Sequence, residues 1–276
     1  MNADAFGSDP GDPLDVWLGE PAGHPPIAGT RLQRFEFASR GDRVPGRLLL
    51  PALPGRRFPL VLLQHGAGGS KDSPYLDAAA GPWVRGGAAV ASIDFPLHGE
   101  RASAKLSARA LAEISAALGR TDGVSGLWVE FVHQAVGDLR RALDALEDHP
   151  ELEMSRCAYA GFSMGTILGA SFCGIDPRPC AAALAIGGGG FGPSEVDPAR
   201  WIGRFAPRPV LFVNASRDER VPRAASEALF AAAGEPKEIT WFDCSHSELP
   251  GAALKAMWIF LQRHLLLAEK PHTTGG

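Results

Sequence analysis

The sequence is poor in cysteine and has no long apolar run. Its four cysteines, in a chain of 276 residues, lack the paired spacing of a zinc site or a disulfide framework: Cys157, Cys173, Cys180 and Cys244. We therefore expect reduced, mostly buried cysteines, although Cys173 and Cys180 could approach each other across a turn. No stretch approaches the roughly 18 uninterrupted apolar residues of a membrane span, and we expect no membrane partner.

The sequence also has no excess of positive charge. The formal net charge is −4 at pH 7, which leaves no basic surface for nucleic acid and argues against a nucleic-acid partner. The stretch 1–15 contains acidic residues, glycines and prolines, but no cationic flank followed by an apolar run. It therefore does not resemble a signal peptide, and we expect a cytoplasmic protein. Internal repeats are absent as well.

What the chain does contain is the composition of a soluble globular domain, with 45% hydrophobic and 21% charged residues. Its length suits one domain, which we place at 29–268. Residues 1–28 are rich in Pro, Gly and Asp, and only Trp17 and Leu18 could pack. We expect them to form a flexible N-terminal arm. Residues 269–276 have no core residues and should form a tail.

Apolar runs alternate with amphipathic helical patterns along this domain. Alternating residues after Arg31 and the run at 46–50 predict two antiparallel strands joined at Gly41-Asp42. The later runs are apolar on both faces, which is typical of parallel strands covered on both sides. We expect a three-layer α/β/α sandwich around a mostly parallel twisted sheet of about eight strands. The runs lie at 59–64, 88–95, 157–160, 181–186, 209–214 and 237–242, and helices are expected at 75–86, 127–147, after Ser163, and at 222–234 and 249–267.

The segment 101–126 is longer than a link between strand and helix requires. Its apolar residues recur with helical period. A helical insertion after the carboxyl end of a strand is where a small lid would sit over the ligand crevice of an open sheet. A helix packed on the body without a gating role is the alternative.

The most informative stretch is Gly161-Phe162-Ser163-Met164-Gly165, between an apolar run and a helical pattern. A serine with glycines two positions away on each side fits a nucleophile elbow, whose tight turn leaves no room for larger residues. The turn would lift the Ser163 hydroxyl clear of the sheet. The alternative is a glycine-rich turn with a solvated serine, so the interpretation depends on a base, an acid and an oxyanion site elsewhere.

Candidates for the acid and the base follow two later strands. Asp218 comes after the 209–214 run and His246 after the 237–242 run, so both should lie with Ser163 at the carboxyl edge of the sheet. The chain order Ser, Asp, His is that of the α/β-hydrolases. Asp243 or Glu219 could supply the carboxylate instead. Other candidates are better explained as structural: His65 and His98 as alternative bases, and Cys244 as an alternative nucleophile without an elbow.

From about 48 to 265 the chain resembles the α/β-hydrolase superfamily, and within it the dienelactone hydrolase-like serine esterases. The matching segments are His65-Gly66-Ala67-Gly68-Gly69, Gly161 to Gly165, Asp218 with the following Val221-Pro222, His246, and the turn Asp94 to Gly99. One departure limits the inference. Dienelactone hydrolase itself uses a cysteine nucleophile where this chain has Ser163, so its lactone substrate is not carried over.

The resemblance implies the role of each residue. Ser163 would be the nucleophile, His246 the general base and then acid, and Asp218 the carboxylate that orients the imidazole. Backbone N–H groups of Met164 and Ala67 would form the oxyanion hole. The implied reaction is hydrolysis of a small-molecule carboxylic ester through an acyl-enzyme, without metal or organic cofactor, by a monomer or homodimer. A peptidase or thioesterase on the same triad, or a non-catalytic binding protein of this fold, are the alternatives.

The substrate pocket is the least defined expectation. Five apolar residues near the predicted strand ends could line an acyl or alcohol pocket, although each would equally suit the core: Phe95, Leu97, Phe162, Trp128 and Phe191. No cluster of Arg or Lys in the sequence demands an anionic substrate.

Overall fold

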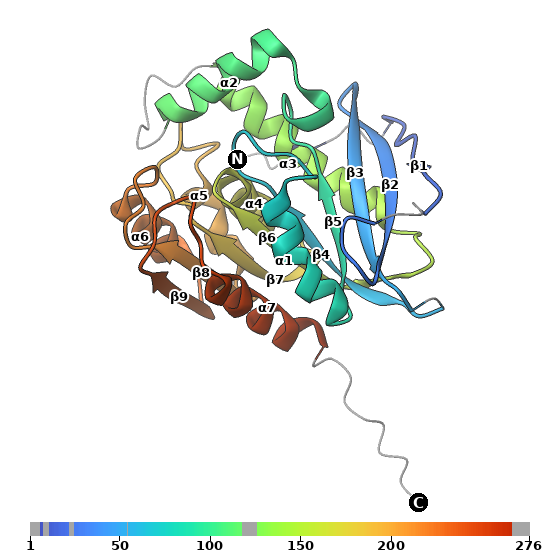
Figure 1. The fold of residues 1–276 in the computed structure, drawn as a ribbon. Coiled ribbons are helices and arrows are strands. Elements are labelled where there is room, and N and C mark those ends of the chain that lie inside the picture. Colours follow the sequence, from blue (N-terminus) through green and yellow to red (C-terminus); the bar gives the residue numbers. More distant parts are fainter. Residues whose placement is uncertain (1–5, 8–10, 22–24, 54, 118–125, 267–276) are drawn as a thin grey trace, which may run out of the picture.

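A nine-stranded sheet organises the molecule, with strand order β1-β2-β3-β5-β4-β6-β7-β8-β9 (Figure 1). The computed structural model describes all residues except 1–5, 8–10, 22–24, 54, 118–125 and 267–276. The expected tail at 269–276 therefore lies outside the described residues, as does part of the expected lid.

The three strands at one edge of the sheet are antiparallel. They are β1 (Trp17–Leu18), β2 (Thr30–Ser39) and β3 (Asp42–Pro51). The turn between β2 and β3 is made by Arg40 and Gly41, both with positive φ, of 49° and 80°. Such left-handed residues match the twist of a two-residue hairpin, where glycine fits without steric cost. The predicted hairpin is confirmed, with its turn one residue earlier than the expected Gly41-Asp42, because Asp42 already pairs with Ser39.

The remaining six strands are parallel to one another. They are β4 (Phe58–Gln64), β5 (Ala89–Ile93), β6 (Leu152–Phe162), β7 (Pro179–Ala185), β8 (Val210–Ala215) and β9 (Lys237–Phe242). Every residue of β4, β5 and β8 is buried, which explains why these strands appear as continuous apolar runs. The expected three-layer, mostly parallel fold is confirmed, and the ninth strand is the short β1.

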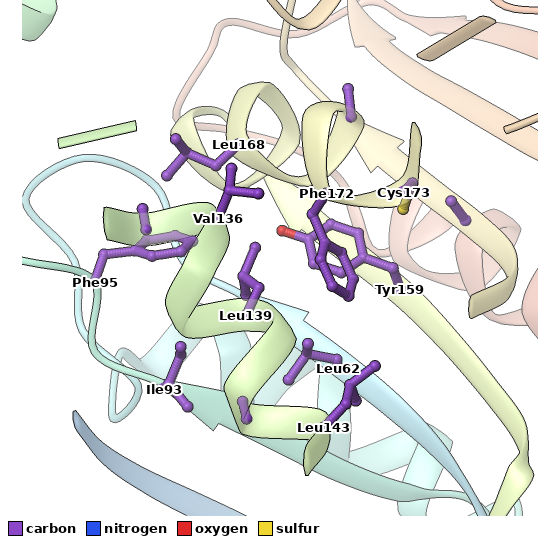
Figure 2. Close-up of a cluster of buried hydrophobic side chains, with 14 of the residues drawn as sticks. Leu62, Ile93, Phe95, Val136, Leu139, Leu143, Tyr159, Leu168, Phe172 and Cys173 are labelled. Atoms are coloured by element: carbon purple, nitrogen blue, oxygen red, sulfur yellow. The ribbon is translucent and has the colours of Figure 1, made fainter. Parts of the chain in front are cut away.

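Helices cover both faces of the sheet. On one face α1 (Pro74–Arg85) and α7 (Gly251–Leu266) enclose one core cluster; the other face carries α3 (Gly126–Leu146), α4 (Met164–Ile175), α5 (Pro198–Ile202) and α6 (Arg223–Ala232). Short 3₁₀ turns occur at Gly99–Arg101 and Gly203–Phe205. Figure 2 shows Leu139 and Leu143 of α3 in the same buried cluster as Leu62 and Ile93 of the sheet, and Val136 of α3 near Leu168 of α4.

The described part of the N-terminal arm is attached to the body, which corrects the expectation of a flexible arm for these residues. Trp17 and Leu18 pair with β2, and Phe6 is 1% exposed in the larger core cluster. Arg141 of α3 donates hydrogen bonds to the carbonyl oxygens of Asp12 and Pro13, at 3.3 and 2.8 Å. Hydrogen bonds to these carbonyls and an aromatic anchor hold the described part of the arm in place despite its Pro- and Gly-rich composition.

The segment 101–126 contains α2 (Ala104–Ala117), which packs against α3 beyond the carboxyl edge of the sheet (Figure 1). Its start is fixed by Ser107, whose Oγ donates to the carbonyl oxygen of Leu97 at 2.6 Å. Helix α2 is thus the expected helical insertion. No helix in the part of the chain that the structure describes is both long and apolar enough to cross a membrane.

Candidate active site

Ser163 lies in a strained turn between β6 and α4. Its backbone has φ 53° and ψ −113°, a conformation that costs free energy for a residue with a side chain. A Cβ at Gly161 would lie 2.5 Å from the carbonyl oxygen of Gly165, and one at Gly165 would lie 2.8 Å from the carbonyl oxygens of Gln64 and His65. Both glycines are therefore sterically required, which is the geometry of a nucleophile elbow.

The structure brings the three predicted catalytic residues together. The imidazole Nε2 of His246 lies 2.9 Å from Ser163 Oγ. Its Nδ1 lies 2.9 and 2.8 Å from the two carboxylate oxygens of Asp218. The residues follow the carboxyl ends of β6, β8 and β9, so the parallel strands deliver all three to one edge of the sheet. The arrangement matches a base that can take the serine proton and a carboxylate that orients the base.

Asp218 is held ionised by its neighbours. Burial alone would raise the pKa of its carboxyl, but hydrogen bonds from His246 and from the amides of Val221 and Arg220 outweigh burial and hold the pKa below its usual value. A carboxylate can therefore accept the Nδ1 proton of His246 and keep the Nε2 lone pair facing Ser163.

The alternative carboxylates have other partners. Glu219 accepts a hydrogen bond from the backbone N–H of His246 at 3.0 Å, so it holds the histidine loop without touching the imidazole. Asp243 is paired with Arg217 at 2.9 Å on the surface. Asp218 is thus the carboxylate on the histidine ring.

His65 organises the loop that approaches Ser163 from β4. Its Nδ1 lies 2.8 Å from the carbonyl oxygen of Gly66, and its Nε2 accepts the N–H of Phe95 at 3.2 Å. Since Nε2 is the acceptor, the proton resides on Nδ1. Burial lowers the pKa of His65 to about 4, so the ring is neutral near neutral pH. His98 is also buried and binds the carbonyl oxygen of Pro96. Both imidazoles bind backbone groups, so both histidines occupy structural positions.

The loop after His65 passes directly beside the serine. A Cβ on Gly66 would lie 3.2 Å from Ser163 Cβ and 3.8 Å from its Oγ. This places Ala67 next to Ser163, and Ala67 lines the cavity that opens at the serine. Met164 begins α4, and an N–H in the first turn of a helix has no intrahelical acceptor. The two expected oxyanion amides are thus on the two segments that flank the serine hydroxyl.

Tyr75 belongs to this site and was not found by sequence reasoning. Its phenolic oxygen accepts the N–H of Gly66 at 2.8 Å, and its ring lies edge-on to Phe162 at 5.6 Å between centroids. Tyr75 lies in the first turn of α1, nine residues after Gly66, and the two meet because the intervening loop folds back compactly. The sequence shows only that Tyr75 lies in the helix after the glycine-rich loop, which does not predict this contact.

A cavity of about 340 Å³ opens at the triad. Its wall contains Ser163, His246, Ala67 and Met164, together with residues from β6, α1, α2, α4, α7 and several loops: Gly66, Tyr75, Ile114, Ser115, Phe162, Ile167, Ile186, Arg220, Val221, Ser247, Leu249 and Leu254. Helix α2 contributes Ile114 and Ser115, so the inserted helix forms one side of the cavity. The wall is mostly apolar, as in sites for small organic ligands.

Of the five expected pocket residues, only Phe162 lines this cavity. Phe95 is fully buried against the ring of His65. Trp128 and Phe191 are buried together, since the indole N–H of Trp128 donates to the carbonyl oxygen of Phe191 at 3.1 Å. Leu97 has φ 61° in the turn before α2. These four are core or turn residues, because proximity to a strand end does not determine on which side of the sheet a side chain packs.

The turn Asp94 to Gly99 is structural. The carboxylate of Asp94 accepts the backbone N–H groups of Lys71 and Glu100, at 2.7 and 2.9 Å, and the ammonium of Lys71 at 2.8 Å. A Cβ on Gly99 would lie 2.2 Å from that carboxylate. The turn thus fastens the glycine-rich loop to the start of α2. Within the described ranges, no group of three or more His, Cys, Asp or Glu side chains is placed to hold a metal ion.

No protein-family model matches the sequence, and no curated protein matches it either. Solved structures do. A cold-adapted esterase from an Arctic intertidal metagenomic library has a TM-score of 0.70 and 24% identity, over 89% of this chain and 99% of the other. The acetyl xylan esterase from Paenibacillus sp. R4 has a TM-score of 0.72 and 19% identity, over 92% and 90%. Acetyl xylan esterase 1 from Thermoanaerobacterium sp. JW/SL YS485 has a TM-score of 0.70 and 15% identity, over 96% and 92%.

These neighbours match nearly the whole length of the chain while sharing few identical residues, so the likeness lies in the architecture. The sheet order, the elbow after β6 and the chain order of the three site residues agree with that architecture. The protein has the α/β-hydrolase fold.

Proposed function

We propose that the protein is a serine hydrolase that cleaves carboxylic esters through an acyl-enzyme. The observation that carries the proposal is the continuous hydrogen-bond chain from Asp218 through His246 to Ser163, at 2.8 and 2.9 Å, on the wall of an apolar cavity. A solvated serine in a glycine-rich turn would need neither the strained backbone nor the oriented base. Both features support a nucleophile.

In the first half of the reaction Ser163 Oγ attacks the ester carbonyl carbon while its proton passes to His246 Nε2. The carbonyl oxygen becomes an oxyanion that accepts the N–H groups of Met164 and Ala67. When the tetrahedral intermediate collapses, the bond to the alkoxy oxygen breaks, and His246 gives its proton to the departing alcohol. An ester between Ser163 and the acyl group remains.

In the second half, a water molecule takes the place of the alcohol. It gives a proton to His246 Nε2 and attacks the acyl carbon, and the acid leaves as Ser163 regains its proton. Asp218 stays ionised throughout and stabilises the imidazolium. Each oxyanion donor is worth about 3 kcal/mol in such sites, and the N-terminus of α4 adds a favourable dipole.

A 4-nitrophenyl butanoate assay tests the proposal. Wild-type protein should release 4-nitrophenol, and a fluorophosphonate probe should label one serine. Ser163→Ala should remove labelling and lower kcat by at least about a thousandfold, because the nucleophile is lost. Ser216→Ala is the matched control, since its exposed hydroxyl donates to Asp243 at the surface.

Two results would count against the proposal. Equal turnover by wild type and Ser163→Ala would assign the chemistry elsewhere, and no turnover or labelling would indicate a binding protein. Thioester and aminoacyl-amide analogues of the same acyl group, compared by kcat/KM, distinguish an esterase from a thioesterase or peptidase on this triad.

A further inference from the structure

The cavity at Ser163 is apolar inside and polar at its mouth. Its inner wall is made by buried side chains: Phe162, Met164, Ile167, Ile186 and Val221. Its exposed polar members are Arg220, Ser115 and Ser247. No carboxylate lies on the wall. The phenol of Tyr75 is neutral near neutral pH. Apart from the catalytic histidine, Arg220 is therefore the one residue of the cavity wall whose side chain carries a charge.

The position of Arg220 is fixed at its backbone. Its N–H donates to Asp218 Oδ1 at 2.9 Å, in the turn that also orients the triad carboxylate. The guanidinium makes no hydrogen bond with any residue that the structure describes. Its Nε forms an ion pair with Glu219 Oε1 at 3.7 Å, which is beyond hydrogen-bond distance. Both side chains are more than half exposed, so solvent screens this pair. The other oxygen of Glu219 is occupied by the N–H of His246, so the carboxylate is held on the histidine loop.

The two arginines that flank Arg220 in the sequence, one in the same loop and one at the start of α6, are engaged elsewhere. Arg217 contacts Asp243 at 2.9 Å. Arg223 pairs with Glu227 at 2.7 Å and lies over the ring of Trp241, 4.2 Å from its centroid. Neither lines the cavity. Of these three arginines, Arg220 is the one that lines the cavity, and its donor fork has no hydrogen-bond partner among the described residues. Such a fork fits a carboxylate or phosphate with two parallel hydrogen bonds.

We propose that the ester substrate is amphipathic and anionic: its apolar part fills the cavity beside Ser163, and Arg220 binds a negatively charged group of the substrate at the mouth. This inference rests on the proposed esterase function and names the substrate class of the same site. Arg220 determines specificity and takes no part in bond breaking. Because its side chain is 59% exposed, the attraction weakens as salt screens it.

Matched esters test the proposal. The 4-nitrophenyl monoester of adipic acid and 4-nitrophenyl 6-methylheptanoate have the same acyl shape, but only the first carries a charge. A second pair places the charge on the alcohol side: the butanoate esters of 4-hydroxybenzoic acid and 4-hydroxyacetophenone. We expect wild type to prefer the anionic member of one pair by about tenfold in kcat/KM at low salt, and that pair identifies the side of the ester that Arg220 contacts.

The variants locate the preference. Arg220→Gln should lower the anionic-to-neutral ratio of kcat/KM about tenfold, and salt should lower this ratio in wild type but not in the variant. Arg223→Gln removes a charge three residues away, at the start of α6, and should leave the ratio unchanged. A ratio near one in wild type for both pairs, or a ratio that Arg220→Gln does not alter, overturns the inference while the esterase function stands. Absence of Ser163-dependent hydrolysis of every ester overturns both.

Discussion

At the scale of single residues, His65 makes the stability of the protein depend on pH. The ring is fully buried, and burial lowers its pKa to about 4, whereas in the unfolded chain the pKa is about 6.5. Between these values the unfolded state binds more protons than the folded state. The stabilising contribution of neutral His65 is therefore complete above pH ~6.5 and is lost as pH falls through about 4.

From this difference we predict that protonation linked to His65 lowers the unfolding free energy by about 2 kcal/mol when the pH falls from ~7 to ~4.5. Urea unfolding of wild type and His65→Gln at both pH values measures it. The variant should be less stable at neutral pH and should lose less stability on acidification. His98, His133, His149 and His264 also have pKa values lowered by burial, so the comparison of the two proteins isolates His65. Parallel pH curves would contradict the prediction.

Tyr75 is a positioning residue for the oxyanion loop. Its hydroxyl accepts the N–H of Gly66 beside Ser163, and Tyr75→Phe leaves that N–H without its partner while keeping the ring on Phe162. We expect kcat to fall about tenfold, because small displacements of an oxyanion donor are costly, with a smaller change in KM. Affinity for a boronic acid that mimics the tetrahedral intermediate should fall in parallel with kcat. Loss of substrate affinity alone would argue for a packing role.

At the scale of elements, the strand-turn-helix unit around Ser163 has no room for side chains at its glycines. Gly165→Ala places a methyl group against the carbonyl oxygens of Gln64 and His65, so we expect a loss of about 2 kcal/mol of unfolding free energy and a larger fall in kcat. Gly251→Ala is the control, because a Cβ there meets nothing within 4 Å. Thermal unfolding and the ester assay together measure both effects. An unchanged melting temperature would mean that the turn can relax.

The strands that are buried on both faces are among the elements that could be predicted. Continuous apolar runs located β4, β5, β7 and β8 to within a few residues, because a fully covered strand has apolar residues on both sides. β6 begins at Leu152, before the apolar run at Cys157. Its first half contains partly exposed polar residues and pairs with β4 across a register shift. The short β1 and α5 leave too few residues for a periodic pattern.

At the scale of the whole molecule, the N-terminal arm completes the core. Phe6 is 1% exposed and lies edge-on to Trp201 and His133, with centroids 5.2 and 5.0 Å apart. Phe6→Ala should therefore cost about 3 kcal/mol of unfolding free energy. Trp17→Ala, at a residue 50% exposed, should cost far less. Chemical denaturation measures both, and equal small effects would show that the arm adds nothing to the core.

The triad could be predicted from the sequence, whereas most of the pocket wall could not. Ser163, Asp218 and His246 each follow a predicted strand, and parallel strands end at one edge, so their meeting follows from topology. The cavity wall instead combines Ile114 of α2 with Leu254 of α7. These helices are far apart in the chain, and only tertiary packing brings them to one cavity.

The hydrogen-bond chain at the site has a consequence for how folding can be followed. Ser163 and His246 are 83 residues apart, and Asp218 and His246 are 28 apart. We expect contacts of such sequence separation to form late, because closing long loops costs entropy first. We therefore expect a reactive nucleophile only in molecules in which β6, β8 and β9 have taken their places in the sheet. The fraction of Ser163 that a phosphonate labels at successive times during refolding would therefore report how fast this part of the sheet assembles.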